Sequence, residues 1–313
     1  MQIGYIGLGK MGKNMVLRLH EQGVMVVAWN RSAEPKKEVA AAGVQVTETI
    51  EELIGKLETP RVVWLMLPAG QVVDEFIAQL TPLLSAGDLV IDGGNSFYKD
   101  SLRRSKPLNQ QGIHFMDIGV SGGPKGARDG ACLMIVGEAE DFERVKTICM
   151  AAAAPNAFAR LGPVGAGHFA KMVHNGIEYG MMEALAEGTS VLKNSQFEFD
   201  LAQVMELYNR QSVITSRLVG WAKQAFDKDP TLENVSSQIG SGGGGDKRIP
   251  GEADWTVGAA HELGVQTPVI EDAIKVREDS SSVDESSPNG FRNKVVSVLR
   301  GEFGQHDVKK ENN

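Results

Sequence analysis

The segment GLGKMG, residues 7–12, lies between two hydrophobic patterns of different period. Residues 2–7 form a short apolar run typical of a strand, and residues 11–23 carry apolar side chains at helical spacing. Residues 24–30 indicate a second strand. Because two sequential strands joined by a helix run parallel with a right-handed crossover, we expect the chain to begin with a βαβ unit.

Further apolar runs alternate with helix-like segments through the first half of the chain. These strand candidates occupy residues 61–67, 88–94, 113–120 and 132–137. Such alternation is typical of an α/β fold with helices on both faces of a sheet. We therefore predict an N-terminal NAD(P)-binding Rossmann domain with a doubly wound parallel sheet, spanning residues 1–165.

Apolar spacing becomes helical in the remainder of the chain, which predicts a C-terminal all-α domain at residues 166–313 for substrate binding and oligomerisation. After a long helix-like stretch that begins near residue 167, helices are expected at residues 201–210, 212–226, 255–264 and 268–278. Glycine-rich and serine-rich segments predict loops at residues 239–254 and 280–290.

The composition is that of a globular chain, with 42% hydrophobic and 23% charged residues. Polar residues interrupt every apolar segment and no basic leader precedes the first strand, so we expect no membrane partner and a cytoplasmic location. A net charge of −8 argues against a nucleic-acid partner but allows a local basic pocket for a small anion. Cys132 and Cys149 lack C-x-x-C spacing, so we expect neither a disulfide nor a metal site.

The glycines of GLGKMG have the spacing G-x-G-x-x-G between a strand and a helix. Gly7 allows a tight turn, Gly9 lets the backbone approach a pyrophosphate, and Gly12 lets the helix pack closely on the strand. The anion would lie at the helix N-terminus. The segment therefore predicts dinucleotide binding.

The second strand ends in Asn30-Arg31-Ser32, where an NAD site usually carries Asp or Glu to accept from the ribose 2′-hydroxyl. The guanidinium of Arg31 suits a 2′-phosphate, which favours NADP over NAD. The alternative is that Arg31 stacks on adenine and tolerates either cofactor.

Several segments together resemble the 6-phosphogluconate dehydrogenases, within the wider β-hydroxyacid dehydrogenase group. They are GLGKMG (7–12), NRS (30–32), LMLPAGQVVDEFI (65–77), DGGNS (92–96), GVSGGPKGARDG (119–130), GHFAKMVHNGIEYG (167–180), DWT with AAHELGV (254–265) and RGEFGQH (300–306). At 313 residues the chain is similar to the short bacterial form. The resemblance implies oxidative decarboxylation of 6-phospho-D-gluconate to ribulose 5-phosphate and CO₂, a pentose phosphate pathway reaction, with reduction of NADP or NAD.

Lys171 and Glu178 are seven residues apart, so on a helix their side chains return to the same face, and Asn175 shares it. By resemblance, Lys171 removes the proton of the C3 hydroxyl and later returns a proton to the carbonyl oxygen. Glu178 then protonates C1. The apolar surroundings of Lys171 favour the neutral amine that a base requires.

The resemblance gives roles to other residues of this helix. His174 holds the substrate near C3, Asn175 contacts substrate and nicotinamide, and Tyr179 contacts the substrate phosphate. The apolar residues expected to face the core are Met172, Val173 and Ile177.

Loops at the carboxyl ends of the predicted strands supply further contacts. By resemblance, Asn95 contacts cofactor and substrate, and the hydroxyl and amides of Ser121, Gly122 and Gly123 bind the substrate carboxylate. The remaining cofactor contacts implied by the matching segments are Leu8, Met11, Leu67 and Pro68.

The substrate phosphate requires cations, and Arg277 matches a phosphate-binding arginine of the family. Arg300 and His306 match a C-terminal pair that completes the neighbouring subunit's site. The resemblance thus implies a homodimer or a homotetramer, and the sequence does not distinguish the two.

Two positions depart from the family pattern. Asp254 stands where the family usually has Lys or Arg, and its carboxylate would repel phosphate. The nearest cations, Lys247 and Arg248, lie in the glycine loop, and Pro124-Lys125 replaces residues that are often acidic.

Two other functions fit parts of the pattern. A β-hydroxyacid dehydrogenase or semialdehyde reductase acting on a nonphosphorylated substrate needs Lys171 and Asn175 but neither Glu178 nor Arg300. A non-catalytic NADP-sensing protein on the same fold needs none of the proton-transfer residues, and the presence of Lys171 and Glu178 argues against it.

Overall fold

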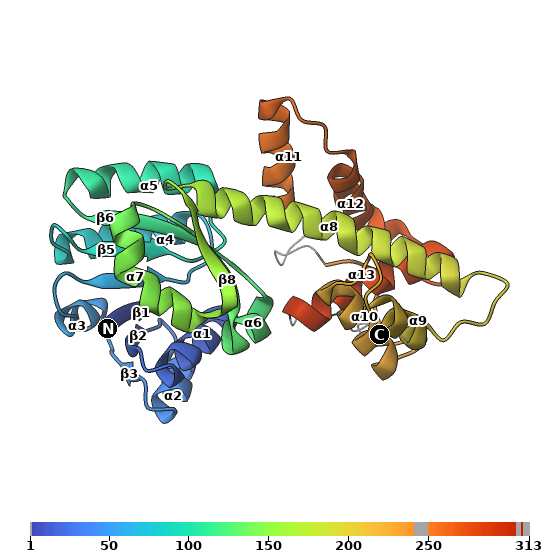
Figure 1. Ribbon diagram of the computed structural model, residues 1–313, viewed down its shortest axis with the longest axis horizontal. Coiled ribbons are helices and arrows are strands. Elements are labelled where there is room, and N and C mark those ends of the chain that lie inside the picture. The colour runs from blue at the N-terminus through green and yellow to red at the C-terminus, as the bar shows by residue number, and fades with distance from the viewer. Residues whose placement is uncertain (1, 241–249, 305–307, 309–313) are drawn as a thin grey trace. The chain divides into compact units, whose positions relative to one another are not determined.

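The computed structural model describes residues 2–240, 250–304 and 308. The chain divides into two compact units, Met1–Met172 and Val173–Asn313. The division falls inside one long helix, α8 (Ala166–Lys193) (Figure 1).

The first unit is built on an eight-stranded sheet with the strand order β3-β2-β1-β4-β5-β6-β7-β8. Neighbouring strands are parallel except β6 and β7, which are antiparallel. The strands are β1 (Gln2–Ile6), β2 (Met25–Trp29), β3 (Gln45–Val46), β4 (Val62–Leu65), β5 (Leu89–Asp92), β6 (His114–Ser121), β7 (Ala131–Val136) and β8 (Ala153–Gly162).

Helices cover both faces of this sheet (Figure 1). Successive residues of β1 show the alternation: Tyr5 packs in the core beneath α1, α6 and α7, whereas Ile6 packs beneath α3, α4 and α5. The helices of this unit are α1 (Lys10–Glu21), α2 (Ala33–Ala41), α3 (Ile50–Gly55), α4 (Gln71–Leu80), α5 (Tyr98–Gln110), α6 (Gly123–Asp129) and α7 (Ala139–Ala152).

In its described part the second unit has α-helices joined by loops, one short 3₁₀ turn at Ser280–Ser282 and no strand. Its core is formed by apolar residues of α8, α9, α10 and α13, such as Met182, Phe226 and Val295. Beside α8, its helices are α9 (Leu201–Tyr208), α10 (Arg217–Lys228), α11 (Glu252–Leu263), α12 (Pro268–Asp279) and α13 (Pro288–Gly304). None of the helices among the described residues is long and apolar enough to cross a membrane.

The predicted fold class is confirmed: a Rossmann-type sheet is followed by a helical domain. Two strands were not expected from the sequence. β3 has only two residues, and β8 is an edge strand that contains Pro155 and is mostly exposed, so neither carries a strong apolar run.

Three helix boundaries differ from expectation. α10 begins at Arg217 because the Ser216 hydroxyl caps it by accepting from the Val219 amide, so the preceding residues are not helical. α11 begins at Glu252, inside the predicted loop, and α13 begins at Pro288, inside the other.

The first turn of α8 lies against β6 without intervening side chains. A Cβ added to Gly119 of β6 would meet Lys171 Cβ at 2.6 Å and the Gly167 carbonyl oxygen at 2.9 Å. A Cβ added to Gly167 would meet the Met134 carbonyl oxygen at 2.7 Å. The two glycines therefore set how closely Lys171 approaches the sheet.

We predict that Gly119→Ala destabilises the protein by about 1–3 kcal/mol, because the added methyl group must displace the α8 backbone. The matched control is Gly188→Ala on α8, where an added Cβ meets nothing within 4 Å. It should be neutral or stabilising by up to about 1 kcal/mol. Urea unfolding of both variants measures the difference, and equal stability would contradict the close approach.

Candidate active site

The turn after β1 has the geometry of an anion cradle. Gly7 adopts a φ of 103°, and a Cβ there would lie 2.3 Å from the Met66 carbonyl oxygen. A Cβ on Gly12 would lie 2.0 Å from the Gly7 carbonyl oxygen. Gly9 is the N-cap residue of α1, which has neither a side-chain cap nor an acidic residue in its first turn, and a Cβ on Gly9 would meet nothing within 4 Å. The helix N-terminus thus fits a pyrophosphate.

The ends of β1 and β2 are joined by a side-chain bridge. The Leu8 amide donates to Asn30 Oδ1 at 2.9 Å, and Asn30 Nδ2 donates to the Ser32 carbonyl oxygen at 3.1 Å. Arg31, between them, is exposed. Met11 is partly buried and packs on the core beneath α1.

The loops after β4 and β5 meet at the same edge of the sheet. Leu67 and Pro68 follow β4, and a Cβ on Gly94 would lie 2.6 Å from the Leu67 carbonyl oxygen. Asn95 is exposed at the tip of the loop after β5. The order β2-β1-β4-β5-β6 places the ends of these parallel strands together, with the reversal of strand order between β1 and β4.

β6 ends at Ser121, and the next two residues turn the chain into α6. Gly122 and Gly123 have φ values of 122° and 63°, which only glycine adopts readily. All three are partly exposed. Their place at the carboxyl edge is that of a ligand-binding loop.

Lys171 belongs to the first unit and is only 7% exposed. Further along α8, His174 Nδ1 lies 2.9 Å from Asn175 Oδ1 and 3.8 Å from Glu178 Oε2. His174, Asn175 and Glu178 are partly exposed residues of the second unit. The expectation for Ile177 was wrong: its side chain is 54% exposed, because the face of α8 opposite its packed side remains open there.

Tyr179, Arg277 and Arg300 form a cationic cluster in the second unit. The Arg277 guanidinium carbon lies 3.2 Å from the centre of the Tyr179 ring, and Nη2 lies 3.7 Å from the Met182 sulfur. Burial, reinforced by the charge of Arg300, lowers the pKa of Arg277 to about 10, so it remains charged at neutral pH. Burial also lowers the pKa of Arg300. Within the described ranges, neither guanidinium forms an ion pair with a carboxylate.

Arg300 therefore lies beside Arg277 and Tyr179 of its own chain, close enough for its charge to act on Arg277. The expected partner of Arg300, His306, lies outside the described residues, as do Lys247 and Arg248.

Asp254, the departure from the family pattern, has a local structural role. Its Oδ2 accepts from the Gly251 amide at 2.8 Å in the first turn of α11. A carboxylate at this position also stabilises the positive end of the helix dipole.

The sequence pattern does not single out Asp117, although a carboxylate within the apolar strand β6 is an unusual signal. Asp117 is fully buried; Oδ1 accepts from the Gly165 amide at 2.6 Å and Oδ2 from the His168 amide at 2.8 Å. Burial raises the pKa of Asp117. His168 Nδ1 lies 2.7 Å from Ser101 Oγ. These groups fix the first turn of α8, one turn before Lys171.

No group of three or more His, Cys, Asp or Glu side chains in the described part of the chain is arranged to hold a metal ion. The sheet order, the glycine cradle and the lysine-bearing helix after the sheet define the class of protein: a Rossmann-type dinucleotide-binding fold with a helical domain.

The chain belongs to the 6-phosphogluconate dehydrogenase family. Residues 2–165 match the NAD binding domain of 6-phosphogluconate dehydrogenase, and residues 167–312 match its C-terminal domain.

Two relatives named as 6-phosphogluconate dehydrogenases align with nearly the whole of this chain. "Putative 6-phosphogluconate dehydrogenase YqeC" of Bacillus subtilis is 42% identical, over 99% of this chain and 100% of YqeC. An NAD(+)-dependent, decarboxylating 6-phosphogluconate dehydrogenase of Haloferax volcanii is 34% identical, over 99% of each chain. The solved Plasmodium falciparum 6-phosphogluconate dehydrogenase, described with its cofactor NADP+, has a TM-score of 0.77 and 29% identity, over 96% of this chain and 70% of its own.

Two glycine variants should affect dinucleotide binding and folding stability separately. Gly9→Ala should leave the melting temperature unchanged, since the φ of −66° suits any residue and the added Cβ has open space. It should weaken dinucleotide binding by about tenfold or more, because the methyl group occupies the anion position. Gly12→Ala should instead lower stability by about 1–3 kcal/mol. Cofactor fluorescence titration and thermal unfolding distinguish them; unimpaired binding by Gly9→Ala would refute the cradle.

Proposed function

We propose that this protein is a decarboxylating, NAD(P)-dependent 6-phosphogluconate dehydrogenase. The observation that carries the proposal is the Tyr179, Arg277 and Arg300 cluster, because it offers two guanidinium groups to an anion. A phosphate could pair with both of these desolvated cations. A nonphosphorylated hydroxyacid has only its carboxylate, which we propose is bound by Ser121, Gly122 and Gly123, so it would leave the two guanidinium groups without a substrate anion.

The residues of α8 account for the proton transfers. Lys171, which is 7% exposed, accepts the proton of the C3 hydroxyl as the general base. The bound dinucleotide supplies the acceptor for the C3 hydride. The Lys171 ammonium then donates its proton to the C3 carbonyl oxygen, so that electrons released from the C1–C2 bond as CO₂ departs are held in an enediol.

Glu178 donates a proton to the enediol carbon that was C2 of 6-phosphogluconate and becomes C1 of ribulose 5-phosphate. We propose that His174 and Asn175 orient the substrate around C3, and that Ser121, Gly122 and Gly123 bind its carboxylate with a hydroxyl and backbone amides. Asn95 contacts both ligands. The dinucleotide is held at Gly7, Leu8, Gly9, Met11, Gly12, Asn30, Arg31, Ser32, Leu67 and Pro68.

Three broader features complete the proposal. The functional division of the chain lies between residues 165 and 166, at the start of α8. The protein is cytoplasmic and forms a homodimer or homotetramer, for which exposed apolar residues of the second unit such as Ile177, Val191 and Val269 are candidates. We propose that Arg300 and His306 act as a pair in a substrate site that is completed between neighbouring subunits. Light scattering that gives a monomer would refute the assembly.

The substrate is tested by comparing 6-phosphogluconate with gluconate. The wild-type protein should reduce cofactor with the first and not with the second. Arg277→Met should raise KM for 6-phosphogluconate by about 100-fold, since a hydrogen bond between charged groups is lost. Its melting temperature should not fall, because a desolvated cation is removed.

The matched control is Arg210→Met, which removes an exposed arginine paired with Glu206 and should change neither quantity. An unchanged KM in Arg277→Met, or equal activity with gluconate, would favour a nonphosphorylated substrate.

The proton-transfer roles are tested on one helix. Lys171→Ala and Glu178→Gln should each lower kcat by about 10²–10⁴-fold with small effects on KM, the usual range for a lost acid or base. Glu187→Gln, an exposed neighbour on α8, should have normal kinetics. Steady-state assays of the three variants suffice, and near-normal turnover of Lys171→Ala would eliminate its assigned role.

We propose NADP as the preferred cofactor, with NAD possible, because Arg31 is exposed at the end of β2, where a 2′-phosphate would lie. Arg31→Ala should reduce kcat/KM for NADP by about tenfold and leave that for NAD within about twofold. If the ratio of the two values does not change, Arg31 does not select the cofactor.

A further inference from the structure

Arg104 of α5 is 2% exposed, and its guanidinium joins two loops. Nη2 donates to the Gly70 carbonyl oxygen at 2.8 Å, and Nε donates to Asp74 Oδ1 at 2.8 Å. Nη1 lies 3.2 Å from Ser96 Oγ and 3.4 Å from Asp92 Oδ2. One side chain thus connects the segment before α4 to the segment before α5.

These are the segments that carry predicted cofactor contacts. The loop between β4 and α4 contains Leu67 and Pro68 and ends at Gly70. The loop between β5 and α5 contains Asn95, whose neighbours on both sides are tied to one carboxylate: the Gly94 amide and the Ser96 hydroxyl donate to Asp92 at 3.1 and 2.7 Å. Asn95 is exposed between two anchored residues.

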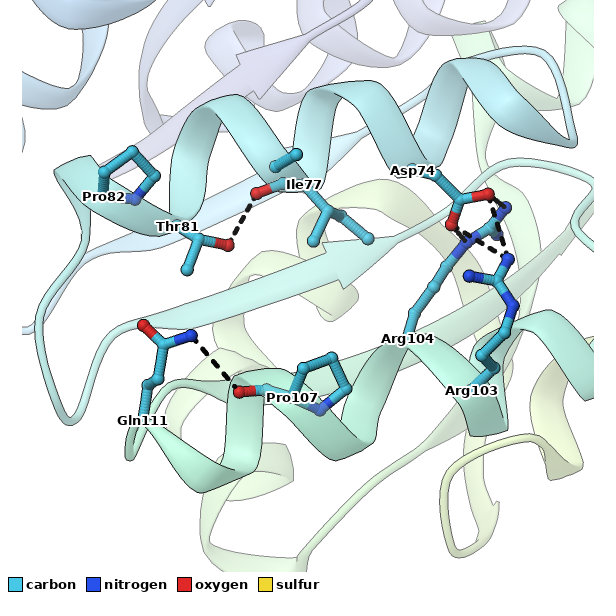
Figure 2. A pocket seen from close by; sticks show the side chains of 9 residues that line it. Asp74, Ile77, Thr81, Pro82, Arg103, Arg104, Pro107 and Gln111 are labelled. Atoms are coloured by element: carbon cyan, nitrogen blue, oxygen red, sulfur yellow. Dashed lines mark hydrogen bonds and ion pairs between the residues drawn. The ribbon is translucent and has the colours of Figure 1, made fainter.

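The adjacent residue, Arg103, gives a direct comparison (Figure 2). Both arginines reach Asp74 from α5, and together the three side chains form one end of an open pocket of about 530 Å³ between α4 and α5. The Arg103 side chain is 57% exposed, and among the described residues its hydrogen bonds are to Asp74 and Asp100. Of these two arginines, Arg104 is the one that contacts the loop carrying Asn95, through Ser96 Oγ.

The burial of this hydrogen-bond network indicates that it fixes the relative position of the two loops as well as contributing to folding stability. Asp92 is fully buried, and a buried ion pair recovers little net folding energy because both charges are desolvated. A planar guanidinium with several fixed donors nevertheless defines the relative position of the groups it contacts. The hydrogen bond from Arg104 is also the main reason that the pKa of Asp74 falls to about 2, so the contact persists at neutral pH.

We propose that Arg104 is a positioning residue for the dinucleotide site: it holds the loops after β4 and β5 in the binding shape before any ligand arrives. The nature of the ligand rests on the proposed function, whereas the tethering of the loops does not. Arg104 itself touches neither cofactor nor substrate.

The test compares Arg104→Lys, which keeps the charge and loses the planar fork, with Arg103→Lys. In the ligand-free protein, hydrogen exchange of the amides at residues 93–97 should accelerate by about tenfold in Arg104→Lys, as loss of a charged hydrogen bond predicts. The equilibrium Kd for NADP and for NAD, measured by fluorescence, should rise by a similar factor, about tenfold. Arg103→Lys should match the wild type in both measurements.

Ser96→Ala gives a second route if Arg104→Lys does not fold. It removes only the loop hydroxyl that donates to Asp92 and accepts from Arg104, and should raise both quantities by about threefold. Exchange in α7, distant from these loops, and the melting temperature report any general loss of stability.

Unchanged exchange at residues 93–97 and unchanged Kd in Arg104→Lys, or equal changes in α7, would overturn the inference and leave Arg104 a purely structural residue. If wild-type protein bound neither NADP nor NAD, the proposed function would fail, while the exchange comparison would still decide whether Arg104 tethers the loops.

Discussion

The first turn of α8 approaches β6 at Gly119 and Gly167. The buried carboxylate of Asp117 accepts hydrogen bonds from two backbone amides at the start of this helix, those of Gly165 and His168. This contact determines where a 28-residue helix begins on the sheet. Lys171 is consequently fixed at the carboxyl side of the Rossmann sheet, whose loops carry the dinucleotide cradle. The sequence spacing of Lys171, Asn175 and Glu178 corresponds to one face of a helix.

The expected anion-binding positions differ in charge from the chain as a whole. The chain is acidic overall, with a net charge of −8, yet cationic or uncharged groups lie at the expected anion positions. The first turn of α1 contains no acidic residue, and Arg277 and Arg300 have no ion-pair partner among the described residues. Asp254, which stands where the family usually has a basic residue, accepts a hydrogen bond from the Gly251 amide at the start of α11. A local cationic cluster therefore coexists with an acidic surface.

Much of the fold follows from local patterns in the sequence. The βαβ unit, the alternation of strands and helices, and the change to helix after residue 165 all rest on hydrophobic period and glycine placement, which act over a few residues. β8 was missed because an edge strand needs little apolar surface, and the reversed direction of β7 has no local signal. Ile177 was assigned to the core because its spacing is apolar, but its exposure depends on which neighbours pack against α8.

In the candidate site, too, some features follow from local sequence and others depend on tertiary packing. The glycines 7, 9 and 12 were predictable, because each has a backbone role that the spacing specifies. The supporting groups Asp117 and Arg104 were not, since their partners come from segments distant in the sequence. The arrangement of Arg277 over Tyr179 likewise depends on the packing of α12 against α8, which no single segment encodes.

The central claim is that one protein oxidises C3 and releases C1 of the same substrate. It is tested most directly with 6-phosphogluconate labelled with ¹³C at C1, by measuring labelled CO₂ against reduced cofactor in a single reaction mixture. We predict one labelled CO₂ for each reduced cofactor and an unlabelled pentose phosphate. Reduced cofactor with the label retained in a six-carbon product would contradict the account, because the chain would then be a dehydrogenase without the decarboxylation that Lys171 and Glu178 are proposed to support.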